Sequence, residues 1–302
     1  MDYILRLENL TKMYGKQTVV DHVNFTVEAG HICGLIGPNG AGKTTIMKMI
    51  AGIAEPTGGS IGLFGSKENL NSNRSRASFM LEAPILEPSM NARQNMEYIR
   101  YVRGVEDQNR ISEILEFVGL SHVGKKKAGQ FSLGMRQRLG IAMALLPSPE
   151  LMILDEPVNG LDPEGIVEIR NIIKKLSSEK GITILISSHL LSELSEICTD
   201  YVIVREGKVV ESLSAEDLEK KCSNYIAIRT DNILQTATVL EQALHTKNYK
   251  IVEDEIYLYD HMDCVEQVSR EITGHNLTIT KFLVQTESLE KYYMSKVGSF
   301  YE

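Results

Sequence analysis

The nine residues from Gly37 to Thr45, Gly-Pro-Asn-Gly-Ala-Gly-Lys-Thr-Thr, constrain this chain more than any other stretch. They match the phosphate-binding pattern G-x-x-x-x-G-K-[ST] at every required position. The glycines let the backbone curl so that successive N–H groups point inward at phosphate oxygens. The apolar residues 31–36 predict a strand before the loop, and a helix is expected to follow it, with an N-terminus that favours anions. A glycine-rich turn before an ordinary helix is the alternative, and the strand–loop–helix context disfavours it.

The sequence therefore predicts a nucleotide site. Lys43 is expected to reach the β- and γ-phosphates, and the Thr44 hydroxyl is expected to ligate Mg²⁺. The residues assigned to nucleotide binding in this loop are Gly37, Pro38, Asn39, Gly40, Ala41, Gly42, Lys43, Thr44 and Thr45.

Length and composition set the remaining bounds. A chain of 302 residues that is 43% hydrophobic and 24% charged has the composition of a soluble globular protein of about two domains. The formal net charge of −8 disfavours a direct partnership with nucleic acid or anionic lipid. The four cysteines are scattered, which favours a reducing cytoplasm. No signal peptide is expected, and no apolar stretch approaches the roughly 18 residues that span a bilayer, so a membrane function would need another chain.

Strand and helix patterns alternate over most of the chain and predict an α/β core in residues 1–215, with a helical subdomain at about residues 83–146. Strand patterns come first, and residues 11–15 are expected to form a turn. The last stretch, residues 216–302, predicts the order β-α-β-β-α-β of a small, ferredoxin-like α+β domain. Its last element is expected to be a helix at residues 288–296. This domain carries no recognisable catalytic constellation, so binding, dimer contact or regulation are its open roles.

Two further strands are expected to end in polar side chains beside the phosphate loop. The apolar residues 151–154 lead directly to Asp155 and Glu156, and ligands bind at the carboxyl ends of parallel strands. Asp155 suits Mg²⁺, and Glu156 suits the deprotonation of an attacking water. His189 ends the next apolar strand, which should lie beside the Asp155 strand, so its ring could reach the γ-phosphate. The alternatives are acids that face solvent and a structural histidine.

Local sequence leaves two other features open. The ring of Tyr14 could stack on an adenine base or pack on the sheet. The run Lys125-Lys126-Lys127 is interpreted as a solvated face, with a membrane-facing role as the minor alternative.

Taken together, these motifs resemble the ATP-binding subunit of an ABC transporter, over about residues 3–215. The phosphate loop matches the Walker A motif, residues 151–156 match the Walker B strand and catalytic glutamate, residues 159–162 match the D-loop with Asp162, and His189 matches the switch histidine. Tyr14 falls where this family places its adenine-stacking aromatic residue. The resemblance implies a P-loop NTPase core of ABC type.

Two positions depart from the common family pattern. The signature, usually Leu-Ser-Gly-Gly-Gln, reads Phe-Ser-Leu-Gly-Met from Phe131 to Met135. It keeps Ser132 and Gly134, which in the family touch the γ-phosphate of the partner's ATP. The loop that normally carries Gln carries Glu82, which is expected to ligate Mg²⁺ and approach the nucleotide. Glu82 and this form of the signature resemble the bacitracin and lantibiotic resistance branch.

The resemblance implies ATP and Mg²⁺ as cofactors. It also implies a head-to-tail homodimer on the cytoplasmic face of the cell membrane, with membrane-spanning permease subunits as partners and no nucleic acid. The expected function is ATP hydrolysis coupled to the export, or removal from the membrane, of antimicrobial peptides. Two alternatives stay open: an exporter of another cargo (drug, lipid or ion), and a complex that senses peptide without moving it.

Overall fold

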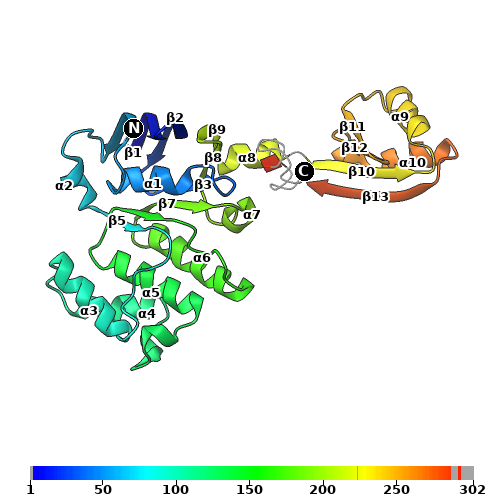
Figure 1. Ribbon diagram of the computed structural model, residues 1–302. Coiled ribbons are helices and arrows are strands. Elements are labelled where there is room, and N and C mark those ends of the chain that lie inside the picture. Colours follow the sequence, from blue (N-terminus) through cyan, green and yellow to red (C-terminus); the bar gives the residue numbers. More distant parts are fainter. Residues whose placement is uncertain (1–2, 223, 287–291, 294–302) are drawn as a thin grey trace. The chain divides into compact units, whose positions relative to one another are not determined.

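The computed structural model describes residues 3–222, 224–286 and 292–293. The chain divides into two compact units, residues 1–215 and 216–302 (Figure 1). Among the described residues, no helix is both long enough and apolar enough to cross a bilayer.

The first unit contains nine strands, seven α-helices and two short 3₁₀ turns within its described residues. The strands are β1 (Tyr3–Tyr14), β2 (Gln17–Glu28), β3 (Ile32–Ile36), β4 (Gly58–Leu63), β5 (Ala77–Met80), β6 (Leu151–Leu154), β7 (Thr183–Ser188), β8 (Asp200–Arg205) and β9 (Lys208–Ser214). The helices are α1 (Lys43–Ile50), α2 (Leu70–Arg74), α3 (Ala92–Arg103), α4 (Asn109–Phe117), α5 (Leu133–Leu145), α6 (Pro163–Ser178) and α7 (Leu191–Leu194). The 3₁₀ turns are Ser121–Val123 and Ala128–Gln130.

Two sheets sandwich α1. The larger sheet has the strand order β5-β6-β7-β3-β8-β9. Its first five strands in this order pair in parallel, and β9 pairs antiparallel with β8. The smaller sheet is antiparallel, with the order β2-β1-β4. Ile46, Met47 and Ile50 of α1 share one buried cluster with Leu7 of the smaller sheet and Leu35 of the larger. The apolar runs of β3, β6 and β7 are fully buried, as expected for parallel strands covered on both faces.

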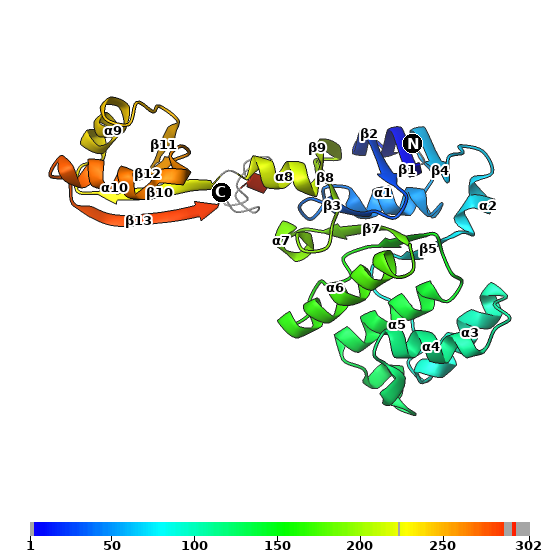
Figure 2. The ribbon, with the colours of Figure 1, turned by 180° about the vertical axis from the view of Figure 1, so that it is seen from behind.

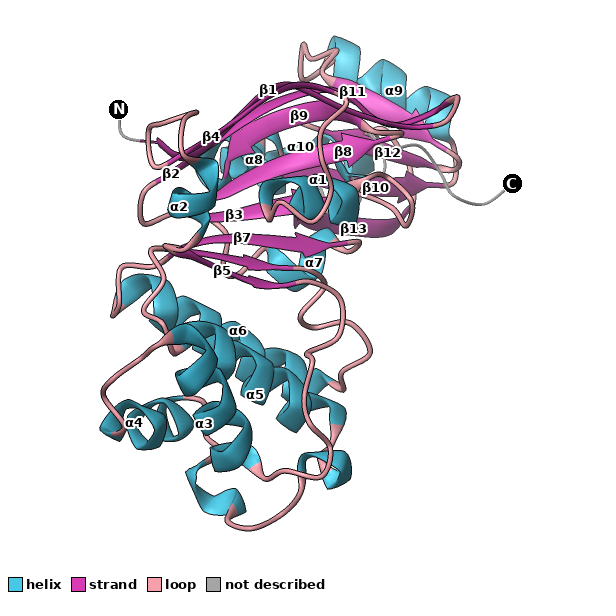
Figure 3. Ribbon diagram, turned by 60° about the vertical axis from the view of Figure 1, so that its left-hand side comes forward, coloured by secondary structure: helices cyan, strands magenta, loops and turns pink. Residues whose placement is uncertain are grey.

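Helices α3, α4 and α5 form the helical part of this unit. They lie together on the side of the larger sheet that β5 borders (Figure 3). Asn91 begins α3 with a capping box, in which its side chain accepts from Gln94 N–H while Gln94 bonds the Asn91 N–H. Ser132 caps α5 in a similar way by accepting from Met135 N–H.

The structure corrects one expectation near the N-terminus. Residues 11–14 are not a turn, because β1 continues to Tyr14 and pairs there with Gln17, so that the turn consists of Gly15 and Lys16. The register of this pair shifts between Leu7 and Met13, and these irregularities hide the period-two alternation that would have indicated a strand. The short helices α2 and α7 were not predicted either.

The second unit begins within α8 (Ala215–Lys221). Its order is β10 (Asn224–Thr230), α9 (Ile233–Gln242), β11 (Tyr249–Val252), β12 (Glu255–Leu258), the 3₁₀ turn Met262–Cys264, α10 (Val265–Gly274) and β13 (Ile279–Thr286). The strands form the antiparallel sheet β11-β12-β10-β13. Two helices pack on it around a separate buried cluster that includes Ile228, Leu240 and Ile272 (Figure 2). Of the helix expected at residues 288–296, only residues 292–293 lie within the described part, and both are helical.

Candidate functional site

The phosphate loop (residues 37–45) joins β3 to α1, and its backbone conformation requires glycine. Gly42 has φ of +101°, in the left-handed region that residues with a Cβ rarely adopt, and an added Cβ would lie 2.9 Å from the Val19 carbonyl oxygen. A Cβ on Gly37 would lie 2.3 Å from the Val204 carbonyl oxygen. These positions tie the loop closely to the strands around it, with its last residues opening α1.

Lys43 folds back over this loop. Its ammonium group donates to the carbonyl oxygens of Gly37 at 2.6 Å and Pro38 at 3.2 Å, and it lies 3.2 Å from Glu156 Oε1. The side chain is only 6% exposed, so its charge acts in a poorly solvated place. The loop therefore holds one buried cation beside the N-terminus of α1, as phosphate binding requires.

Asp155 lies where β6 ends and brings two hydroxyl groups together. Thr44 Oγ1 donates to Asp155 Oδ2 at 2.7 Å, and Ser187 Oγ donates to Asp155 Oδ1 at 2.5 Å. β6 and β7 pair in parallel, as the sequence predicted, so their carboxyl ends meet at one edge of the sheet. The hydroxyl and carboxylate oxygens of Thr44 and Asp155 are donors of the type that Mg²⁺ prefers, so these residues fit the metal.

Glu156 has a partner on each carboxylate oxygen. Oε1 faces Lys43, and Oε2 accepts from His189 Nδ1 at 2.8 Å. Its backbone is in the left-handed region at φ +49°, which is costly for a residue with a side chain, and its N–H donates to Ser187 Oγ at 2.8 Å. The structure thus gathers Lys43, Thr44, Asp155, Glu156 and His189 into one hydrogen-bonded group.

Ser187 belongs to the same group and was missed by sequence reasoning. It is fully buried, and its hydroxyl connects Asp155 to the Glu156 backbone. The polar end of an otherwise apolar strand, Ser-Ser-His at residues 187–189, is the signal that could have found it.

Glu82 was expected near the metal, and the structure pairs it with a second missed residue. Lys48 of α1 donates to Glu82 Oε1 at 2.6 Å. The hydrogen bond and charge of Lys48 lower the pKa of the Glu82 carboxyl, and Glu82 in turn raises the pKa of Lys48. Glu82 has φ of +63° at the start of the loop that joins β5 to α3.

Within the described part of the chain, Tyr14, Ser132, Gly134 and Asp162 form no hydrogen bond or ion pair with this group. Tyr14 is about half exposed, and Lys12 Nζ lies 4.9 Å from its ring centroid. Ser132, Gly134 and Asp162 line a separate pocket of about 500 Å³, where Ser132 caps α5 and Asp162 caps α6 by accepting from Gly165 N–H at 3.1 Å. Their roles toward a nucleotide stay predictions.

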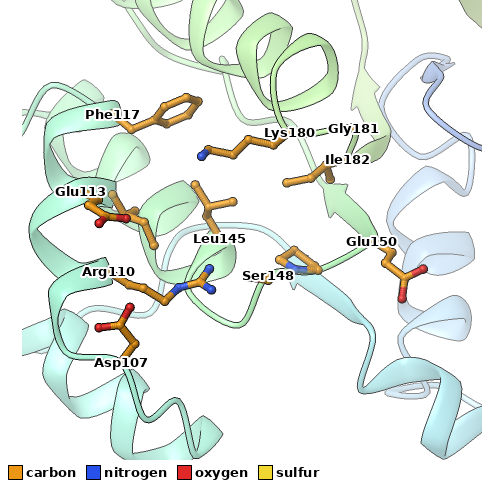
Figure 4. A pocket seen from close by; sticks show the side chains of 12 residues that line it. Asp107, Arg110, Glu113, Phe117, Leu145, Ser148, Glu150, Lys180, Gly181 and Ile182 are labelled. Atoms are coloured by element: carbon orange, nitrogen blue, oxygen red, sulfur yellow. The ribbon is translucent and has the colours of Figure 1, made fainter.

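Another pocket, of about 590 Å³, lies at the opposite end of β6 and β7 (Figure 4). Glu150 precedes β6 and Ile182 precedes β7, whereas Asp155 and His189 follow the same strands. Arg110 and Lys180 point into this pocket, Asp107, Glu113 and Glu150 also line it, and none of the predicted site residues does.

An α/β fold with a phosphate loop between β3 and α1 and two carboxylates at the end of β6 defines a P-loop nucleotide-binding protein. The family model described as ABC transporter matches residues 20–159. The chain belongs to the ABC transporter ATP-binding family, because relatives in that family are about 40% identical over nearly its whole length. It is an ATPase coupled to transport, and both the family resemblance and the fold class expected from the sequence are confirmed.

Among these relatives is a bacitracin transport ATP-binding protein, BcrA, of Enterococcus faecalis, which is 40% identical over 99% of this chain and 97% of that protein. The lantibiotic transport ATP-binding protein SrtF of Streptococcus pyogenes is 44% identical over 72% of this chain and 94% of that protein. Among solved structures, an ATP-binding subunit of an ABC transporter covers 72% of this chain and 92% of its own, with a TM-score of 0.64 and 30% identity. The dimeric cassette MJ0796 bound to ADP and phosphate has a TM-score of 0.62 and 26% identity, over 70% of this chain and 98% of its own.

Proposed function

We propose that this chain is the ATP-hydrolysing subunit of a transporter that exports antimicrobial peptides of the bacitracin or lantibiotic type, or removes them from the membrane. The observation that carries the proposal is the 40% identity to bacitracin transport proteins over 99% of the chain. That similarity covers 99% of the chain and so includes the second unit, residues 216–302. The match to the lantibiotic transport protein covers only 72% of the chain. Residues 1–215 serve as the nucleotide-binding domain, and residues 216–302 serve as an accessory domain.

The hydrogen-bonded group supports a division of labour in hydrolysis. The loop N–H groups and Lys43 bind the β- and γ-phosphates, while Thr44 and Asp155 hold Mg²⁺, which neutralises phosphate charge when bound. Glu156 accepts the proton of the attacking water, and general base catalysis of this kind contributes about 10²–10⁴ in rate. His189 holds the Glu156 carboxylate at 2.8 Å and so orients it.

A second copy of the chain completes each site. Ser132 and Gly134 lie at the N-terminus of α5, where a helix favours an anion, and Asp162 lies nearby in the same pocket. In a head-to-tail homodimer these residues face the ATP held by the partner's phosphate loop, and Tyr14 stacks on the adenine. The dimeric cassette among the similar structures supports this arrangement.

The permease docks beside the loop that carries Glu82. Ile85 in this loop is 91% exposed, and the neighbouring helix α3 exposes Tyr98, Tyr101 and Val102. A pocket of about 190 Å³, lined among others by Ile85 and Ile99, opens between them. An exposed apolar surface of this kind is typical of a protein–protein contact. Docking there places the chain on the cytoplasmic face of the membrane.

The test is peptide resistance in a sensitive cell that expresses the chain with its permease. Protection should require both proteins, and it should disappear in Lys43→Ala, because loss of the buried ammonium removes phosphate binding. Lys174→Ala, an exposed lysine on α6, is the matched control and should keep full protection. Bacitracin, a lantibiotic and an unrelated drug should be compared at equal growth inhibition.

Three results would contradict the proposal. Protection by the Lys43→Ala complex would indicate sequestration of the peptide. Protection against the drug alone would assign another cargo. Peptide-stimulated ATPase without protection or removal would indicate a sensing complex.

A further inference from the structure

The ion pair between Lys48 and Glu82 links two elements that are distant in the sequence. Lys48 lies on α1, one helical turn after Thr44, and Glu82 lies 34 residues further on, just after β5. Their 2.6 Å contact joins the helix that follows the phosphate loop to the loop between β5 and α3. The negative charge of Asp155 also acts on Lys48 and contributes to its raised pKa. Lys48 is therefore within electrostatic reach of the carboxylate proposed to hold Mg²⁺.

The Glu82 loop also touches the helix that begins with the signature residues. A Cβ built on Gly140 of α5 would lie 2.7 Å from Pro84 Cβ and Cγ, so the loop and α5 are in close contact at this point. Tightly packed contacts transmit displacement because protein interiors have little free space. Pro84, two residues after Glu82, therefore lies against α5, the helix that Ser132 caps and whose first turn carries Gly134.

The ion pair is suited to exchange rather than to permanent stabilisation. The Lys48 side chain is 35% exposed and the Glu82 side chain is 65% exposed. Exposed pairs contribute little to stability, because water screens the charges and both side chains lose conformational freedom. A divalent cation close by competes effectively for such a carboxylate, because oxygen anions are its preferred ligands.

We propose that Lys48 is a positioning residue that competes with Mg²⁺ for the Glu82 carboxylate. In one arrangement Glu82 bonds Lys48, as in this structure; in the other it turns to the metal beside Thr44 and Asp155 and carries its loop along. Lys48 thereby sets how strongly the metal-bound nucleotide draws this loop toward the phosphate loop. The inference deepens the proposed function and rests on the nucleotide site assigned there.

The first experiment measures ADP binding to the full chain with Mg²⁺ and with a chelator. The dissociation constant measured with the chelator is divided by the one measured with Mg²⁺. This ratio reports how much the metal strengthens ADP binding, and it cancels the general attraction of Lys48 for phosphate. The variants are Lys48→Gln, Glu82→Gln, the double variant, the conservative Lys48→Arg, and Lys174→Gln as control.

We expect Lys48→Gln to raise the ratio about threefold to fivefold, because Glu82 is then released to the metal. Lys48→Arg and Lys174→Gln should stay near wild type. In the Glu82→Gln background, Lys48→Gln should change the ratio by less than about 1.5-fold, as a double-mutant cycle between contacting residues requires. If Lys48→Gln changed the ratio equally in both backgrounds, Lys48 would act only as a nearby positive charge, and the inference would be overturned. An unchanged ratio in Lys48→Gln would overturn it as well.

The second experiment follows the loop itself with an environment-sensitive fluorophore on Ile85→Cys. Cys33, Cys198 and Cys222 are buried, so Cys264→Ser is the one accompanying change needed against background labelling. Mg²⁺–ADP should shift the emission, and Lys48→Gln without nucleotide should shift it part of the way. An emission in Lys48→Gln identical to wild type would overturn the inference. If the wild-type chain bound no nucleotide at all, the proposed function would fail instead.

Discussion

Glu156 shows at the scale of one residue how the site prepares a carboxylate for catalysis. The strand β6 ends at Leu154, and Glu156 follows with a left-handed backbone that Ser187 holds by accepting its N–H. Lys43 and His189 each contact one carboxylate oxygen, so the side chain has little rotational freedom. Fixing a base in this way lowers the entropy cost of reaching the reactive geometry.

Glu156→Gln is expected to lower ATP turnover at least about 100-fold, because the amide keeps the shape of the side chain but cannot accept a proton. ATP binding should persist, and an ATP-bound dimer should accumulate because the shared γ-phosphate is not removed. Steady-state turnover, nucleotide affinity and size-exclusion profiles measure these three quantities. Glu179→Gln at the exposed end of α6 is the control, and turnover near wild type in Glu156→Gln would contradict the assignment of the base.

At the scale of an element, α5 carries two glycines in different surroundings. A Cβ on Gly134, in its first turn, would meet only Leu161 Cδ2 at 3.8 Å, an ordinary contact. A Cβ on Gly140, two turns later, would meet Pro84 at 2.7 Å and Met80 Sδ at 2.8 Å. Packing within the chain therefore requires glycine at residue 140 but leaves room for a methyl group at residue 134.

The two Gly→Ala variants should separate stability from function. Gly140→Ala is expected to lower the free energy of unfolding by about 1–3 kcal/mol through overpacking. The free energy of unfolding of Gly134→Ala should stay within about 0.5 kcal/mol of the wild-type value, since surface substitutions rarely change it by more. This variant should nevertheless lower ATPase activity by about tenfold, because the new methyl group would meet the partner's nucleotide. Denaturant unfolding and turnover test both variants, and unchanged turnover in Gly134→Ala would argue against a role for α5 at the shared site.

At the scale of the whole molecule, the phosphate loop and the signature residues serve two different nucleotides in the proposed dimer. Among the described residues of one chain, the hydrogen-bonded group around Lys43 shares no residue with the pocket around Ser132. A site completed by a second copy explains why one chain presents both halves separately, as expected for a head-to-tail pair with two-fold symmetry.

Mixing Lys43→Ala chains with Ser132→Arg chains should restore activity that neither variant has alone. A mixed dimer keeps one composite site intact, while its other site loses both halves. Random pairing makes about half of the dimers mixed, so about a quarter of wild-type turnover is expected. Differently tagged chains allow mixed dimers to be isolated and counted. If isolated mixed dimers hydrolyse no ATP, the shared-site model is wrong.

The sequence by itself determined the phosphate loop, the α/β core and the strand-end carboxylates. These features depend on consecutive residues: glycine spacing sets the loop conformation, and apolar runs indicate buried strands. The turn predicted from the sequence at residues 11–14 was wrong, because the shifting register between β1 and β2 depends on a partner strand that local patterns do not show.

Only the tertiary structure decided which side chains meet. Ser187 reaches Asp155 across 32 residues because β6 and β7 are neighbours in the sheet. Lys48 reaches Glu82 across 34 residues because the fold places the turn after β5 beside α1. The polar end of the strand could have indicated Ser187 as a site residue, but local sequence names neither its partner nor that of Lys48. Their partners follow from strand order and chain packing, which are set by burial of the whole core rather than by any single segment.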